Sequence, residues 1–153
     1  MAKKEPTYTW NQETGEATYT IYYKDLTFTG KATCHPDDED MKSQLMGLTI
    51  AERRALISYM SHVLNNELKP KLAAYKQLYY NMKHSKKFNP KGYEAKMIYR
   101  QIEIFEDDIF HVRETINSHK FSLREYLRGK EELHQTLREK RKAKSDQENT
   151  SEN

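Results

Sequence analysis

The second half of the chain carries apolar residues in a repeat of seven. Every seventh position from Ala95 reads Ala95, Ile102, Ile109, Ile116, Leu123, Lys130 and Leu137, and the interleaved positions read Ile98, Phe105, Val112, His119, Tyr126 and Leu133. This repeat predicts one long helix with a coiled-coil-like seam that must be buried against a partner. We predict that the helix spans about 90–142, with Asn89 as its cap and Pro90 in its first turn.

A second apolar stripe, from Ile57 to Met82, predicts another helix over about 50–83. Thr49 and Glu52 have the spacing of a capping box at its start. Pro70 lies inside the stripe, and apolar residues continue on both sides of it. Since proline removes one internal hydrogen bond and clashes with the preceding turn, we predict a kink at 66–70 rather than an end of the helix.

The connection from His84 to Asn89 is short, and short connections join antiparallel neighbours. The two helices are therefore expected to form a hairpin, in which the second helix outruns the first by roughly 15 residues. Gly129 weakens this overhang, so a bend or fraying is expected there. Residues 143–153 are polar and predict a disordered tail.

The first region alternates threonine with aromatic residues, which predicts three strands between residues 7 and 34. A two-residue turn at Lys24-Asp25 and a four-residue loop over 12–15 fix the register. Both loop lengths place the same set on one face, namely Tyr8, Trp10, Tyr19, Ile21, Tyr23, Leu26 and Phe28. The sequence therefore predicts a three-stranded antiparallel meander with one apolar face.

Gly30 and Ala32 continue this face with almost no side chain, so we expect a helix to approach closely there; a bound ligand is the alternative. Residues 35–40 read His-Pro-Asp-Asp-Glu-Asp, which favours a short helix that ends near Met46 before Gly47. The alternative is a divalent-metal site, although adjacent carboxylates splay apart and rarely converge on one ion.

Composition fits a few long helices with narrow buried faces. The chain has 153 residues, of which 36% are hydrophobic and 32% charged, and its net charge is +3. The fold class expected is α+β, predominantly α: the meander packed on the long antiparallel hairpin. We expect one folded unit, made of a meander with a short helix (1–47), the hairpin (48–142) and the tail.

The same numbers limit the class of protein. One cysteine, Cys34, excludes an internal disulfide and is typical of a reducing cytoplasm. No apolar run approaches the roughly 18 residues that a membrane helix needs, and the amino terminus lacks the apolar core of a signal peptide. We therefore expect a cytoplasmic protein that does not enter a membrane.

Two basic clusters are candidate binding sites for nucleic acid or a partner. The first lies at the hairpin tip and comprises Lys83, His84, Lys86, Lys87, Phe88 and Lys91; the second lies near the carboxy terminus and comprises Arg138, Lys140, Arg141 and Lys142. Lysines bind phosphate and an aromatic ring can stack on a base. The alternatives are a solvated loop whose Phe88 staples the next helix, and a basic helix end that suits the dipole.

Little in the sequence indicates catalysis. His119 occupies a seam position, where a lone polar residue sets the register or pairs with a neighbour. The acidic run Glu106-Asp107-Asp108 is expected on the solvated side of its helix. No nucleophile motif, glycine-rich phosphate loop or metal-ligand spacing is present, so we expect no catalytic residue, no metal and no cofactor.

Two segments carry a resemblance. They are Cys34-His35-Pro36-Asp37-Asp38-Glu39-Asp40, and residues 82–91 (MKHSKKFNPK) continuing into 93–97 (YEAKM) and Tyr99-Arg100. With them, the chain from about Tyr19 to Lys142 resembles small proteins of unassigned activity encoded by bacteriophages and prophages of Gram-positive bacteria. The resemblance implies action inside an infected bacterial cell, and it carries over no functional residue.

The sequence thus favours a non-enzymatic interaction protein that binds a host or phage macromolecule through the hairpin. A protein partner is expected, with a homodimer through the seam of the second helix or its overhang. The first alternative is a nucleic-acid-binding accessory protein that uses the two basic clusters. The second is an enzyme with a site where Gly30 and Ala32 meet the acidic turn.

Overall fold

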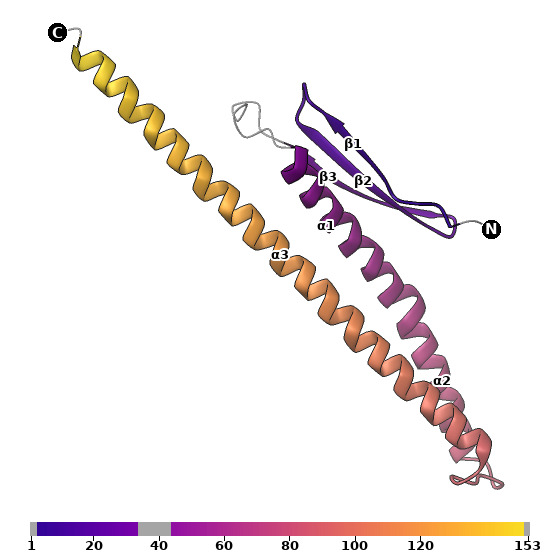
Figure 1. Cartoon of the computed structure of the whole chain (residues 1–153). Coiled ribbons are helices and arrows are strands. Elements are labelled where there is room, and N and C mark those ends of the chain that lie inside the picture. Colours follow the sequence, from indigo (N-terminus) through magenta and orange to yellow (C-terminus); the bar gives the residue numbers. More distant parts are fainter. Residues whose placement is uncertain (1–2, 34–43, 152–153) are drawn as a thin grey trace.

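A computed structural model describes residues 3–33 and 44–151. Three strands come first, namely β1 (Thr7–Asn11), β2 (Glu16–Tyr23) and β3 (Leu26–Thr33), followed by α1 (Gln44–Val63), the π-helical turn η2 (Leu64–Leu68), α2 (Lys69–Lys83) and α3 (Tyr93–Ser151). The sheet lies on one side of α1, and α3 runs along the other side (Figure 1). This is the predicted α+β, predominantly helical fold, with a meander on an antiparallel helical hairpin.

The sheet has the order β1-β2-β3 and is antiparallel throughout. Both predicted loop lengths are confirmed by pairs that face each other across the strands: Tyr23 with Leu26, Ile21 with Phe28, Trp10 with Ala17, and Tyr8 with Tyr19. The apolar face is covered mainly over β2 and β3, where α1 packs. At its margins Tyr8 and Leu26 remain exposed.

The close approach predicted at Gly30 is confirmed. A Cβ built on Gly30 would overlap the carbonyl oxygen of Ala51 and lie 2.6 Å from the backbone nitrogen of Ala55. Ala17 and Ala51 beside it are fully buried. The backbone of α1 thus rests directly on the sheet, and the alternative of a ligand at Gly30 and Ala32 is wrong because the helix fills that space.

The start of α1 differs from the prediction. The helix begins at Gln44 and passes through Gly47, which we expected to stop it. Gly47 is needed for packing, since a Cβ there would lie 2.9 Å from the Trp10 ring and 3.0 Å from the Ala17 Cβ. Thr49 is inside the helix and its hydroxyl donates to the carbonyl of Leu45 at 2.7 Å, so it does not form the predicted capping box. The predicted acidic turn and metal alternative at 35–40 lie outside the described residues.

The irregularity predicted around Pro70 is a π-helical turn. Leu64–Leu68 form this turn, and the backbone N–H of Lys69 donates to the carbonyl of Leu64, five residues earlier. Pro70 follows in the first turn of α2, where its missing N–H costs little. As predicted, the helix continues past the proline, and α2 ends at Lys83.

Helix α3 starts later and ends later than predicted. It begins at Tyr93 because Asn89 is used in a turn, where its side-chain oxygen and its carbonyl accept from the N–H groups of Lys91 and Gly92. We expected fraying or a bend at Gly129, but the helix continues through it and runs to Ser151. It therefore includes residues 143–151, which we had expected to be a disordered tail.

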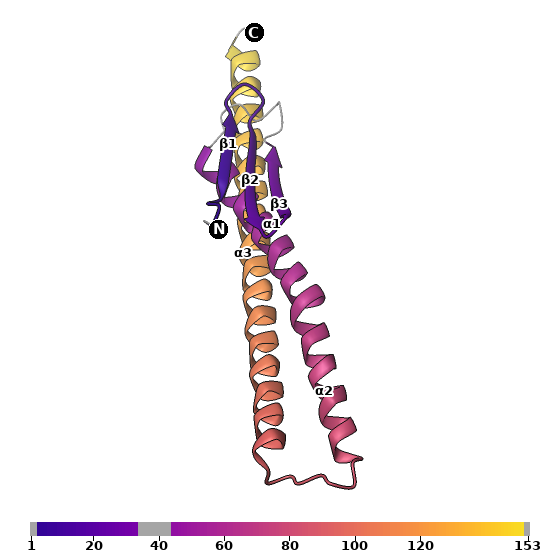
Figure 2. The ribbon, with the colours of Figure 1, turned by 90° about the vertical axis from the view of Figure 1, so that its right-hand side faces the viewer.

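The hairpin divides into two halves. In the sheet-covered half, α1 lies between the sheet and α3, and Leu123, Tyr126 and Leu127 of α3 pack against the core below the sheet. In the sheet-free half, which we define as 69–113, α2 and α3 pair without a third layer (Figure 2). Across both halves α3 buries the predicted seam positions Ala95, Ile102, Ile109 and Ile116 inside its own chain, so these are not available to a second copy.

Candidate functional site

The sheet-free half has a narrow interior. Its helices meet through the ring pairs Tyr75 with Phe105 and Tyr79 with Tyr99, whose centroids are 5.4 and 5.7 Å apart. None of the fifteen residues of α2 is buried. Two helices alone share only one contact line, so most of each helix surface stays in water.

Large apolar side chains are exposed on this half. Seven of them have at least two fifths of their surface accessible, namely Leu78, Tyr80, Tyr93, Met97, Tyr99, Ile104 and Phe110. The largest exposures among them are those of Tyr93, at 78%, and Phe110, at 60%. They do not form one patch, since Phe110 lines one hollow, Tyr99 and Ile104 a second and Tyr93 a third. Exposed apolar side chains beside a hollow are typical of a surface that another macromolecule covers.

One flank of this half forms a shallow apolar hollow of about 470 Å³. We call it the Phe110 face and define it by six residues at its rim, three from each helix: Lys69, Ala73 and Lys76 from α2, and Glu106, Phe110 and Arg113 from α3. Leu72 and Ile109 also line it. At its end nearer the hairpin tip the Lys76 ammonium pairs with the Glu106 carboxylate at 3.1 Å.

The two helices that bound this face carry opposite charge. Helix α2 has four lysines, Lys69, Lys71, Lys76 and Lys83, and no acidic residue. Residues 93–108 of α3 contain five acids and two bases. Within the chain only the Lys76–Glu106 pair joins these two segments among the described residues, so most of this charge faces solvent.

The structure brings the six predicted tip residues together at one end of the molecule, but the rings among them already pack against other rings of the chain. Phe88 lies edge-on to Tyr79, with centroids 6.1 Å apart, and is partly buried. His84 stacks against Tyr80 at 4.2 Å, and Lys83 lies over the Tyr79 ring at 5.5 Å. Phe88 therefore staples the hairpin, as the alternative interpretation predicts, rather than standing free to stack on a base.

The remaining tip cations are accessible. Lys86, Lys87 and Lys91 are exposed, and no ion pair engages them within residues 3–33 and 44–151. A second hollow, of about 490 Å³, lies beside Phe88 and Tyr93. The tip thus presents three exposed cations, of which Lys87 lines this hollow.

The second basic cluster lies far from the first. Arg138, Lys140, Arg141 and Lys142 are exposed on α3, toward the end of the molecule opposite the hairpin tip (Figure 1). At 1.5 Å per residue, Arg138 is about 70 Å along α3 from its start. The two clusters cannot form one groove in a single chain, as expected from the antiparallel hairpin.

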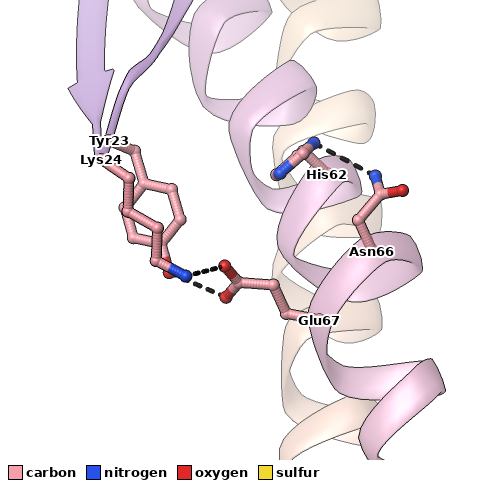
Figure 3. A network of polar contacts seen from close by, with 5 residues as sticks. All are labelled: Tyr23, Lys24, His62, Asn66 and Glu67. Carbon is pink, nitrogen blue, oxygen red and sulfur yellow. Dashed lines mark hydrogen bonds and ion pairs between the residues drawn. The ribbon is translucent and has the colours of Figure 1, made fainter.

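A polar network fastens the sheet to the π-helical turn (Figure 3). The Tyr23 hydroxyl donates to Glu67 Oε2 at 2.7 Å, and the Lys24 ammonium contacts Oε1 of the same carboxylate. These two hydrogen bonds hold the pKa of Glu67 below its ordinary value, and the bond from Lys24 has the larger effect, followed by that from Tyr23. The nearby His62–Asn66 contact, at 3.1 Å, is separate from it. The network has the form of a structural clamp.

His119 pairs with a neighbour, as predicted for a polar seam residue. Its Nδ1 lies 2.9 Å from the guanidinium of Arg53 on α1, which donates to the neutral ring. Burial lowers the pKa of His119, the positive Arg53 lowers it further, and Glu52 opposes both. The neutral imidazole thus links α1 to α3 behind the sheet.

Sequence reasoning missed the Phe110 face. A signal was present, because residues 69–83 contain four lysines and no acid while 93–108 are acidic. The heptad repeat also implied that each helix has positions on either side of its buried line, where such a face could lie. Which flank is hollow, however, depends on how α2 and α3 are rotated about their axes, and this is set by the π-helical turn.

Metal and membrane sites are not indicated in the part of the chain that the structure describes. No group of three or more His, Cys, Asp or Glu side chains converges there, and no helix in it is long and apolar enough to cross a membrane. A scan against protein-family models finds no match, and searches of curated proteins and of solved structures find none either.

Proposed function

We propose that this chain is a non-enzymatic binding protein that holds a protein partner against the sheet-free half of its hairpin. One observation carries the proposal: seven large apolar side chains are exposed on a half in which no residue of helix α2 is fully buried. Protein interfaces are built around such aromatic and apolar anchors within a charged rim. The Phe110 face has this composition, because Phe110 lines it together with the cations Lys69, Lys76 and Arg113.

The resemblance to phage proteins favours a partner inside a bacterial host cell, so we expect the protein to act in that cytoplasm. The sheet-covered half would then be a support. Its core packs α1 against both the sheet and α3, and the Tyr23–Glu67 clamp fastens the sheet to the π-helical turn. Helix α2 continues from that turn without a break. A rigid support lowers the entropy that binding must overcome.

The test compares two exposed phenylalanines of α3. Phe110 lies on the Phe110 face, and Phe121, which is 62% exposed, lies outside the sheet-free half. Proteins captured from the native cells by wild type, Phe110→Lys and Phe121→Lys are identified by mass spectrometry. We expect Phe110→Lys to lose a partner at least tenfold, equivalent to about 1.4 kcal/mol, and Phe121→Lys to retain it. Capture that is unchanged by Phe110→Lys would overturn the proposal.

A second candidate function is nucleic-acid binding at the hairpin tip, favoured by the accessible cations Lys86, Lys87 and Lys91. Lysines that neutralise phosphates release counterions, so affinity should fall steeply with salt. Retardation of DNA or RNA in gels at low salt, weakened by Lys86→Ala with Lys87→Ala, would support it. The matched control is Lys140→Ala with Lys142→Ala in the other basic cluster. Absence of retardation at low salt would exclude this function.

A further inference from the structure

We propose that the partner on the Phe110 face is a second copy of this chain, arranged as a parallel four-helix bundle with α2 of each copy on α3 of the other. This inference rests on the proposed function, because it names the occupant of the same surface. It differs from a dimer through the seam of α3, which the chain buries within itself.

Charge selects the second copy. The α3 side of the Phe110 face presents Phe110 and Glu106, and one turn nearer the tip Glu103 and Tyr99 line the adjoining hollow. Asp107 lines the same adjoining hollow, so the middle of this α3 flank is acidic and aromatic, whereas Lys96 and Arg100 nearer the tip and Arg113 at the other end are basic. The α2 side presents Lys69 and Lys76 around the small Ala73. Each copy therefore carries both the acidic anchor and the basic recess that would receive it.

Symmetry selects the arrangement. A two-fold dimer buries the same patch on both copies, so the patch must complement itself. If the two-fold axis runs across the hairpin, the lysines of α2 meet the lysines of the other α2, which is repulsive. If the axis runs along the hairpin, α2 meets the acidic segment of the other α3. The second arrangement places the two hairpin tips at the same end.

Levels along the hairpin agree with this arrangement. Lys76 and Glu106 lie at one level along the hairpin, since they pair within the chain. A two-fold axis along the hairpin therefore brings Lys76 of one copy opposite Glu106 of the other copy. Ala73 and Phe110 line the same hollow, which would place the Phe110 ring of one copy over the Ala73 recess of the other. A large ring against a small residue is the packing that four-helix bundles use.

Two features limit the affinity of the dimer, namely the small area of the interface and the like charges toward its ends. Helix α2 is about 22 Å long and two paired helices are about 20 Å wide, so the interface is small. Lys69 and Arg113 place like charges at one end of the Phe110 face, and Lys96 and Arg100 add positive charge on α3 toward the tip. Attraction is therefore confined to the middle, and we expect dissociation in the micromolar range, as for other small interfaces.

The experiment is sedimentation equilibrium of the purified full chain over a range of concentrations, with helicity recorded by circular dichroism. Wild type should approach twice the mass of the chain at tens of micromolar. Phe110→Lys and Ala73→Arg should weaken association at least tenfold, because each places a cation against the lysines or fills the recess. Phe121→Lys, the matched control, should associate like wild type.

A charge exchange makes the test independent of folding. Lys76→Glu and Glu106→Lys should each reduce self-association, because like charges then face each other across the axis. An equal mixture of the two variants should associate more tightly than either alone, since every crossed pair is then attractive.

A wild type that stays monomeric, a Phe110→Lys variant that dimerises normally, or a mixture that gains nothing would each overturn this inference. The proposed function fails separately. If the chain is monomeric and another protein is still captured in a Phe110-dependent manner, the second copy is excluded and the binding function stands. If neither occurs, both proposals fail.

Discussion

The two halves of the hairpin use residues of different size. Where the sheet covers it, glycine and alanine bring backbones together, and Ala17, Ala51 and Ala55 have no exposed surface. Where the sheet is absent, tyrosine and phenylalanine rings meet at tilted angles and no residue of α2 is fully buried. Close backbone packing gives a rigid layer with no spare surface. Looser ring contacts leave apolar area exposed, so we expect the sheet-covered half to supply most of the stability, and we propose the sheet-free half as the binding surface.

The largest expected effect breaks the packed half. Gly30→Ala adds one methyl group where the backbone of α1 lies, so the free energy of unfolding should fall by about 3 kcal/mol, the upper range for overpacking. The matched control is Gly129→Ala on α3, where nothing lies within 4 Å of the new methyl group; it should gain about 1 kcal/mol in helix propensity. Denaturant unfolding measures both. Equal effects at the two glycines would refute the close-packed interpretation.

A smaller effect separates the buried line of α3 from its exposed surface. Ile109→Ala removes a side chain that is 6% exposed and packs against Leu64 and Ile116, so it should cost about 2–4 kcal/mol. Ile104→Ala, in the same helix but 42% exposed, should cost less than about 1 kcal/mol. Thermal unfolding of the two variants provides the measurement. A reversed order would mean that α3 is rotated differently in solution.

The smallest expected effect concerns pH in the sheet-covered half. The pKa of His119 is lowered in the folded chain, so the unfolded chain binds more protons just below the ordinary histidine pKa of about 6.5. The free energy of unfolding should therefore fall as pH drops through that window and then level off. His119→Gln should flatten this dependence, whereas His111→Gln, an exposed histidine of the same helix, should leave it as in wild type. Melting temperatures between about pH 7 and 5 measure it.

The sequence predicted the sheet because the number of residues in each loop determines which residues pair across the strands. Two loop lengths placed the same residues on one face, and the pairs Trp10–Ala17 and Ile21–Phe28 follow directly. The small residues Gly30 and Ala32 also predicted the helix above them. In these cases the local pattern and the tertiary packing require the same residues.

The start of α1 could not be read in this way. Gly47 and Thr49 resemble a helix stop and a cap, yet tertiary contacts give both another role. Gly47 makes room for Trp10, and Thr49 bonds back to its own helix. For the candidate site, the sequence placed the lysines of the tip but not the Phe110 face, since a flank between two helices depends on their mutual rotation.

The π-helical turn determines what an insertion or deletion in it would do to the rotation of α2. The residues that face α3 from α1, η2 and α2 are Met60, Leu64, Leu68 and Leu72, and each follows the previous one by four positions. In a regular α-helix, three such steps drift by about 120° around the axis, because each residue turns by about 100°. The π-helical turn contains one extra residue, which removes most of this rotation, so that Leu72 again faces α3. Deleting a single residue from 64–68 would leave the helix nearly as long but turn α2 by about a quarter of a revolution. The segment therefore sets the phase of everything beyond it, and insertions or deletions there would redirect the Phe110 face rather than shorten the arm that carries it.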